Sequence, residues 1–369
     1  MTAEIRVASS PGEARVAVVV DEHLTDYAIW RPGAPDGVGD IHRGRLIARV
    51  AAMAGAFVAI GGAEGFLPDT EGAKGLNAGA LISVRITRSA QGGKGPRLSA
   101  RGIDAAETAS AVGLIRRGPD PITRFAARWP DAPVLTDDPA LLARLRPVLS
   151  ARGALDRAVF DDSLLTDIEA LGETVVTLES GVRLAIHPTP ALVAIDVDAG
   201  AALADRPGKG DRHLEVNRSA IPDLVRQIRL RNLSGAILVD FAGMAAKRRQ
   251  ALRPALAEAL GTDPLRPRLL GFTGLGLAEI VRSRVHPPLH EVLAGPHAAG
   301  LAALRRVAGM MAVDASRMPV LRASPAVVAA LEADAGALAD LAHRAGRGLL
   351  LRADPGLPGT LWTLDDSHG

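Results

Sequence analysis

The chain has 369 residues, of which 48% are hydrophobic and 23% charged, and its formal net charge is +2. That length allows two or three domains with sizeable cores, and the composition excludes a disordered chain. No stretch reaches the ~18–20 consecutive apolar residues of a membrane-spanning helix. The absence of cysteine excludes disulfides, thiolate zinc ligands and a cysteine nucleophile. We find no signal peptide at the N-terminus, so we expect a cytoplasmic protein.

Residues 1–37 are expected to contribute strands. Apolar alternation covers Ile5–Val7 and Ala14–Val20, a Ser-Ser-Pro-Gly turn lies between them, and Leu24–Trp30 can form a third strand. Residues 38–102 then show short alternating strands separated by glycine, for example at 45–50, 55–62 and 80–86. Strands of this length and spacing predict a small β-barrel of the OB type, inserted into the chain.

The rest of the chain divides into three segments that differ in sequence pattern. Residues 103–177 are arginine-rich and mostly helical in pattern, with several proline breaks, whereas residues 178–294 alternate strand and helix. Residues 295–369 contain helices rich in Ala and Leu and an irregular tail, which predicts a small C-terminal domain. The fold class is therefore α/β with an inserted all-β domain.

Two apolar runs in the alternating region each end in a carboxylate, at Asp196 and Asp240. Between them lies a helical pattern that starts near Asn217, which could cap the helix. A crossover of that length makes the two strands parallel and brings their carboxyl ends to one edge of the sheet. Two carboxylates so close would repel unless a cation bridges them, and Mg²⁺ prefers such oxygen ligands.

An ordinary role remains open for these residues. A single Asp at the end of a strand is commonly a helix cap or a turn former. Against this, the sequence has no His-Glu-x-x-His motif, phosphate loop or Gly-x-Ser-x-Gly elbow that would offer a competing chemistry.

Four blocks, in order, resemble the ribonuclease E/G family of endoribonucleases. Three resemble its catalytic core, and the N-terminal block resembles its RNA-binding S1 barrel. They are Val38–Arg45, Leu178–Gly200, Asn217–Phe241 and Gly271–Arg284. The resemblance implies an S1 barrel inserted in an RNase H-like and DNase I-like mixed α/β scaffold, with residues 103–177 as a reduced 5′-sensor and RNase H-like region and 178–294 as the catalytic domain.

The resemblance also implies the site residues. The family's two Mg²⁺-binding aspartates fall on Asp196 and Asp240. A family Asn that helps to orient the site is replaced by Asp198, which adds a negative charge, and Asn217 is a further candidate for supporting the site.

RNA contacts are expected elsewhere in the chain. The aromatic residues of the S1 barrel fall on Phe57 and Phe66, although a Phe in an alternating strand more commonly fills a core. Arginines near the catalytic strands could bind backbone phosphates. The full set of expected RNA-binding residues is Phe57, Phe66, Lys94, Arg117, Arg226, Arg282 and Arg284. The basic run Lys247–Arg249 is interpreted as a solvated helix face.

Two departures from the family pattern change the expectation. Arg117 matches the Arg of the family's Arg-Thr sensor for a 5′-monophosphate, but Gly118 stands for the Thr. The family's CxxC zinc link between protomers cannot form without cysteine, so no zinc site is expected and the oligomeric state is open.

Two functions follow. The first is a Mg²⁺-dependent endoribonuclease that hydrolyses single-stranded RNA to 5′-phosphate and 3′-hydroxyl ends, in rRNA or mRNA processing and with no membrane partner. The alternative is a non-catalytic RNA-binding or ribosome-associated protein on the same scaffold.

Overall fold

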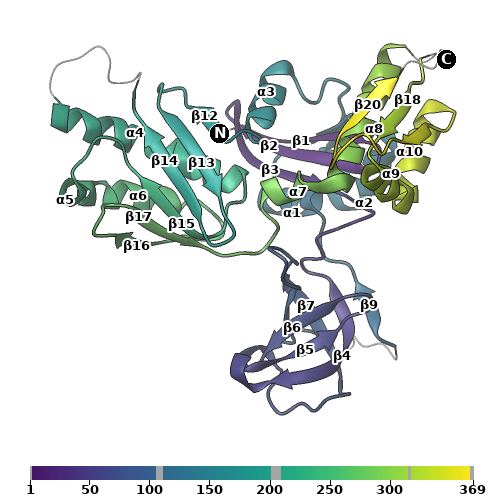
Figure 1. Cartoon of the computed structure of the whole chain (residues 1–369), viewed down its shortest axis with the longest axis horizontal. Coiled ribbons are helices and arrows are strands. Elements are labelled where there is room, and N and C mark those ends of the chain that lie inside the picture. The colour runs from purple at the N-terminus through teal and green to yellow at the C-terminus, as the bar shows by residue number, and fades with distance from the viewer. Residues whose placement is uncertain (1, 105–110, 201–208, 315–316, 366–369) are drawn as a thin grey trace. The chain divides into compact units, whose positions relative to one another are not determined.

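The computed structural model describes residues 2–104, 111–200, 209–314 and 317–365 (Figure 1). The chain divides into two compact units. The first unit contains residues 1–35, 120–165 and 290–369, and the second contains residues 36–119 and 166–289. The helices α3 (Asp162–Ala170) and α7 (Leu289–Val292) lie at the boundaries. None of the helices in the described ranges is long and apolar enough to cross a bilayer.

The first unit is built on a five-stranded sheet of order β11-β10-β1-β2-β3. The three N-terminal strands predicted from the alternation are present, and each is a little longer than its apolar run. The strands are β1 (Ala3–Ser10), β2 (Glu13–Val20), β3 (His23–Trp30), β10 (Val134–Thr136) and β11 (Gly153–Leu155). Side chains of α1 (Pro121–Arg128) and α2 (Pro139–Leu149) share a buried core with this sheet.

The C-terminal part of the first unit has its own hydrophobic core. Strand β18 (Val320–Ala323) lies between β19 (Leu350–Ala353) and β20 (Trp362–Asp365). The packed helices are α8 (Gly295–Val313), α9 (Pro325–Ala333) and α10 (Ala335–Ala345). The described part of residues 295–369 thus has a core of its own within the first unit, and its standing as a separate small domain stays a prediction.

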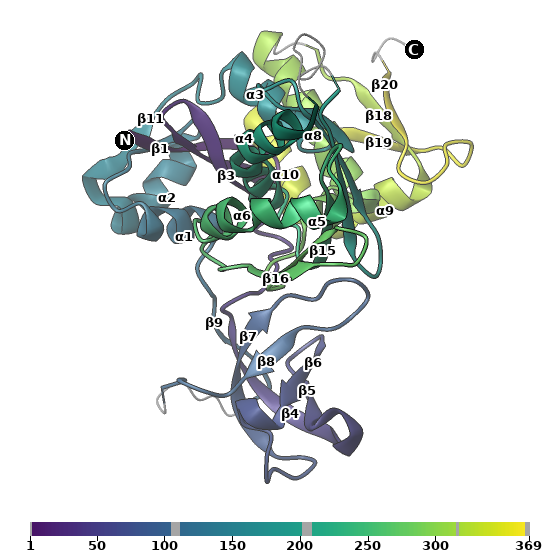
Figure 2. The ribbon, with the colours of Figure 1, turned by 90° about the vertical axis from the view of Figure 1, so that its left-hand side faces the viewer.

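The second unit contains a closed barrel, which confirms the OB-type prediction. Strand β4 (Ile41–Val50) pairs with β5 (Gly55–Ala59) on one side and with β7 (Leu81–Arg88) on the other. The circuit is completed through β6 (Glu64–Pro68) and β8 (Arg97–Ser99), and β9 (Gly113–Arg116) adds to β4. These strands can be followed in Figure 2.

The remaining sheet of the second unit has the order β12-β13-β14-β15-β17-β16. Its strands are β12 (Val175–Thr177), β13 (Arg183–Pro188), β14 (Val193–Asp198), β15 (Gly235–Asp240), β16 (Arg268–Phe272) and β17 (Ala278–Arg282). The crossover helix α4 (Lys209–Leu230) and α6 (Arg253–Leu260) follow β14 and β15, and the short α5 (Ala246–Arg249) lies before α6. Strands β14 and β15 are parallel, as the crossover predicted.

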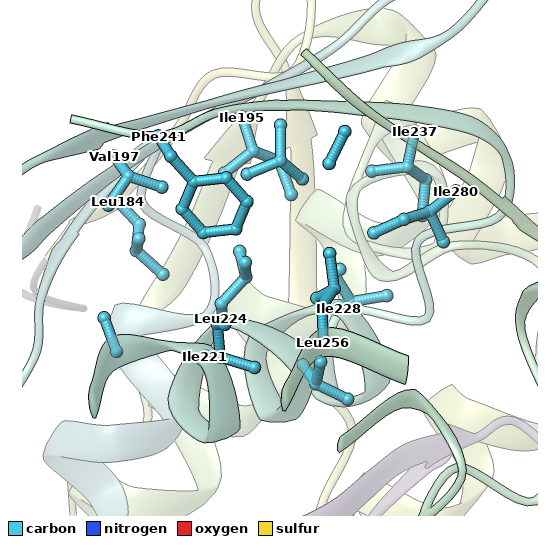
Figure 3. Packing of buried hydrophobic residues seen from close by; sticks show 14 of the residues in the cluster. Leu184, Ile195, Val197, Ile221, Leu224, Ile228, Ile237, Phe241, Leu256 and Ile280 are labelled. Carbon is cyan, nitrogen blue, oxygen red and sulfur yellow. The ribbon is translucent and has the colours of Figure 1, made fainter. Parts of the chain in front are cut away.

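One face of this sheet is buried under α4 and α6. Ile221, Leu224 and Ile228 of α4 point at the sheet and meet Ile195 and Ile237 (Figure 3). These helix positions are the i, i+3 and i+7 stripe read from the sequence. Because successive strand residues alternate between faces, burial of Ile195 and Ile237 turns their neighbours to the opposite face.

The start of α4 differs from the prediction. The helix begins at Lys209, two turns before Asn217, so Asn217 lies inside the helix and is not its cap. The residues from 209 to 216 carry mostly polar and charged side chains, and only Leu214 and Val216 among them pack, partly buried, against the core. The fully buried apolar positions begin at Ala220 and Ile221, so the periodicity is weak over the first two turns.

Arg282 is buried, which differs from its expected place among RNA contacts. Its guanidinium donates to Asp263 at 2.7 Å, to Asn232 Oδ1 at 2.7 Å and to the carbonyl of Leu233 at 3.2 Å. The side chains of Arg282 and Asp263 are 4% and 0% exposed. This ion pair ties β17 to the loops that precede β15 and β16, and its donors are used inside the protein.

We expect Arg282→Ala to destabilise the protein by about 3 kcal/mol, because it leaves the carboxylate of Asp263 buried without its partner. Urea unfolding of the whole chain measures the change. Arg268→Ala, which removes an exposed arginine from the neighbouring strand β16, is the matched control and should change stability by less than about 0.5 kcal/mol. Native stability of Arg282→Ala together with weaker RNA binding would instead support the surface role.

Candidate active site

The paired aspartates lie opposite each other in adjacent strands. The parallel register of β14 and β15 pairs Asp196 with Asp240, and neighbouring strands are about 4.8 Å apart. Ile195, Val197 and Val239 face the buried core, so both carboxylates are on the other face, where Asp196 is exposed. The predicted convergence of the two residues is therefore confirmed by the register, while their role as metal ligands stays a prediction.

Asp240 has an ion-pair partner. Arg249, the last residue of α5, donates through Nη1 to Oδ1 of Asp240 at 2.5 Å. The side chain of Asp240 is 50% exposed and that of Arg249 only 12%. The sequence interpretation of residues 247–249 as a solvated face is thus wrong for Arg249, although Lys247 and Arg248 are exposed.

Asp198 adds a third carboxylate to the same face. It lies two residues after Asp196 on β14, and the antiparallel register places it opposite Arg183 of β13. Its Oδ1 accepts the backbone N–H of Gly200 at 2.9 Å, which forms a tight turn at the end of the strand. The face therefore carries three carboxylates, with Arg183 opposite Asp198 and Arg249 paired with Asp240.

The donor set suits a hard cation that keeps other ligands. Within the described residues, no three His, Asp or Glu side chains are placed to hold one metal ion together. Asp196 and Asp240 can supply two oxygens from adjacent strands. Mg²⁺ is commonly bound by one or two carboxylates, with water and substrate phosphate in its other positions, so the residues present fit this ion.

Asn217 supports the loop that follows Asp240. It is completely buried, and its side-chain amide donates to the carbonyl of Ala242 at 2.9 Å while its Oδ1 accepts the N–H of Ala242 at 3.2 Å. This two-way contact fixes the backbone two residues after Asp240. Its place in the sequence analysis as a supporting residue agrees with this geometry, although the capping role does not.

Sequence reasoning missed His213, which lies one turn before Asn217 on α4. A Cβ on Gly243 would lie 2.0 Å from the nearest ring atom of His213, so the ring lies directly against this glycine of the loop after β15. Gly243 has a φ of +60°, which also favours glycine. Only the tertiary fold brings these two residues together, and no local pattern signals the contact.

The barrel carries its aromatic pair outside its core. Phe57 of β5 is paired in register with Phe66 of β6, and the ring centroids are 5.6 Å apart in an edge-to-face arrangement. Both phenylalanine side chains are half-buried. Their chain neighbours Ala56, Val58 and Leu67 are the residues that point into the barrel interior. The alternative that these phenylalanines fill the core is therefore wrong.

One cation lies beside this aromatic pair, and a second is exposed on a turn of the barrel. Exposed Arg97 of β8 is the register partner of Phe66, a neighbour that the sequence analysis missed. Lys94 is exposed in a tight turn closed by two backbone hydrogen bonds with Gln91. Aromatic faces with neighbouring cations are the usual means of holding single-stranded nucleic acid.

Three other arginines predicted to contact RNA, Arg117, Arg226 and Arg284, already have partners within the protein. Arg117 is 59% exposed but donates to buried Asp40 at 2.6 Å, and Arg226 pairs with Asp223 at 3.0 Å within α4. Arg284 packs its guanidinium against Gly235, at the first residue of β15. Asp240 is the last residue of that strand, so Arg284 lies roughly 16 Å along the sheet from it at ~3.3 Å per residue.

Comparison with known proteins shows similarity to one family of ribonucleases. Residues 152–285, which include both aspartates, match the profile of the Ribonuclease E/G family. Ribonuclease G of Escherichia coli is 26% identical over an alignment that covers 96% of this chain and 98% of the relative. That alignment has 480 positions, so more than 100 residues of the relative have no counterpart here.

Shorter matches are more similar. Ribonuclease E of a Nostoc species is 36% identical over 32% of this chain and 17% of its own length. Ribonuclease G of Haemophilus influenzae is 36% identical over 32% of this chain and 24% of its own length. The profile match, the similarity to Ribonuclease G along nearly the whole chain and the closed barrel agree with the resemblance seen in the sequence, and the chain is similar to the ribonuclease E/G family.

Proposed function

We propose that this chain is an endoribonuclease that hydrolyses single-stranded RNA with Mg²⁺ held between Asp196 and Asp240. An endoribonuclease role is what the matching family and the full-length relatives support. The observation that carries the metal site is the register of β14 and β15, which sets the two carboxylates side by side on an exposed face. The expected products carry 5′-phosphate and 3′-hydroxyl ends, and processing of rRNA or mRNA in the cytoplasm is part of the same proposal.

Different residues of the chain bind the cation, support the site and hold the RNA. Asp196 and Asp240 bind the cation, and Asn217 holds the loop after Asp240 in place. When bound, the cation would neutralise the scissile phosphate and activate the attacking water. Phe57 and Phe66 stack bases of the RNA, and Lys94 contacts its backbone. Each stacked base contributes about 1–3 kcal/mol and accepts any sequence.

Assembly is the part of the proposal that departs from the family pattern. Because the chain has no cysteine, it cannot form a CxxC zinc link, and any oligomer must use other contacts. The 5′-monophosphate sensor is reduced in the same way, since Gly118 has no hydroxyl to replace a Thr and Arg117 is already paired with Asp40. We propose cleavage that depends little on the state of the RNA 5′ end.

We expect Asp196→Asn and Asp240→Asn each to reduce cleavage of a 5′-labelled single-stranded RNA at least about 100-fold. A metal ion supplies several kcal/mol of charge stabilisation, and each 1.36 kcal/mol is tenfold in rate. The native protein should lose cleavage in EDTA and regain it with Mg²⁺. Asp167→Asn, an exposed aspartate on α3, is the matched control and should retain native activity.

Cleavage that survives both substitutions and EDTA would contradict the site. Binding of the RNA by the native protein without any cleavage in Mg²⁺ would support the alternative, an RNA-binding or ribosome-associated protein on the same scaffold.

Removal of either barrel aromatic should weaken RNA binding. Loss of one stacked base at about 1–3 kcal/mol corresponds to a 5- to 150-fold weaker affinity for Phe57→Ala or Phe66→Ala. Fluorescence anisotropy with a labelled oligonucleotide, in an Asp240→Asn background that prevents cleavage, measures this. Met53→Ala removes an exposed apolar side chain from the same barrel and should bind normally. Native affinity in both phenylalanine variants would show that the RNA does not stack there.

A further inference from the structure

Arg249 lies beside β15, and its guanidinium is held at three points. Its Nη1 donates to Oδ1 of Asp240 at 2.5 Å and to the carbonyl of Gly276 at 3.2 Å, and its Nε donates to the carbonyl of Met244 at 3.0 Å. The three partners belong to the end of β15, the loop after it and the turn between β16 and β17. Arg249 therefore links the segments that surround Asp240.

Two of these anchors do not depend on the carboxylate. The carbonyl oxygens of Met244 and Gly276 fix the guanidinium plane even if Asp240 moves. Gly276 is packed closely enough that a Cβ there would lie 2.8 Å from Ala246 and 3.0 Å from Cδ of Arg249. The side chain of Arg249 is thus held rigidly by the surrounding backbone, and the half-exposed Asp240 is the more mobile member of the ion pair.

The ion pair leaves one oxygen of Asp240 and both oxygens of Asp196 available to bind a metal ion. Arg249 occupies Oδ1 of Asp240, and no side chain or backbone group in the described residues bonds Oδ2 of Asp240 or the carboxylate of Asp196. One oxygen of Asp240 is therefore presented in a set direction beside Asp196. The positive charge of Arg249 also repels a metal cation that approaches Asp240.

We infer that Arg249 is a positioning residue of the metal site, which orients Asp240 and lowers the site's affinity for the divalent cation. This inference rests on the proposed function, because it takes Asp196 and Asp240 as the metal ligands. Because Arg249 engages Oδ1, Asp240 would offer the cation mainly Oδ2, and water and the scissile phosphate would supply other ligands. The arginine would thereby weaken metal binding while it holds Asp240 in a fixed orientation.

The test is a comparison of metal binding and turnover in Arg249→Gln. Isothermal titration of the whole chain with MnCl₂, without RNA, should show an affinity at least threefold tighter than native. The RNA cleavage rate at saturating metal should fall at least tenfold, because Asp240 loses its orientation. The gain in affinity should shrink as NaCl is raised, since screening weakens the effect of the missing charge. Lys247→Gln removes an exposed charge from the same short helix and should change neither quantity.

The opposite directions of the two effects separate this role from a purely structural one. Unchanged or weaker Mn²⁺ binding in Arg249→Gln would overturn the inference. If that variant does not fold, Arg249→Lys keeps the charge but not the planar fork, so it should bind Mn²⁺ with native affinity and cleave at least tenfold more slowly; native turnover would overturn the inference. Native Mn²⁺ binding in Asp240→Asn would instead show that the proposed metal site itself is wrong.

Discussion

The register between β14 and β15 is the constraint on which the candidate site depends. Asp196 and Asp240 meet because Ile195, Val197 and Val239 all face the core beneath α4. A slip of one residue in either strand would turn a carboxylate into that core and an isoleucine or valine to solvent. The cost of burying a charge therefore excludes every register that turns one of these carboxylates into the core. The alternation that packs the apolar side chains against α4 thus also puts both carboxylates on the exposed face.

This alternation explains what the sequence could predict. Each apolar run ends in an aspartate, and a crossover helix between them makes the strands parallel, so the side-by-side placement follows from local pattern and chain geometry. The barrel was predictable for a similar reason, since glycine-punctuated alternation is local. The alternation also places Phe57 on the opposite face from Ala56 and Val58, which the sequence analysis did not use.

The surroundings of arginines could not be predicted in this way. In the run from Lys247 to Arg249 the first two side chains are exposed as expected, yet the third is anchored by a carbonyl of the β16–β17 turn. Arg282 is satisfied by Asp263 and Asn232, which are 19 and 50 residues away in the sequence. An arginine has five donors, and whether solvent, RNA or distant protein oxygens satisfy them is decided only by tertiary contacts.

Asp198 stands where the resemblance to the family implies an asparagine, and such an exchange can change the charge without changing the shape of the turn. Its Oδ1 accepts the N–H of Gly200 at 2.9 Å, and an asparagine can accept the same bond through its own Oδ1. The turn at the end of β14 is therefore compatible with either residue. What the aspartate adds is a negative charge on the face that carries Asp196 and Asp240. The positive charge of Arg249, which is held against Asp240, offsets that added negative charge. Asp198 and Arg249 therefore change the net charge around the aspartate pair in opposite directions.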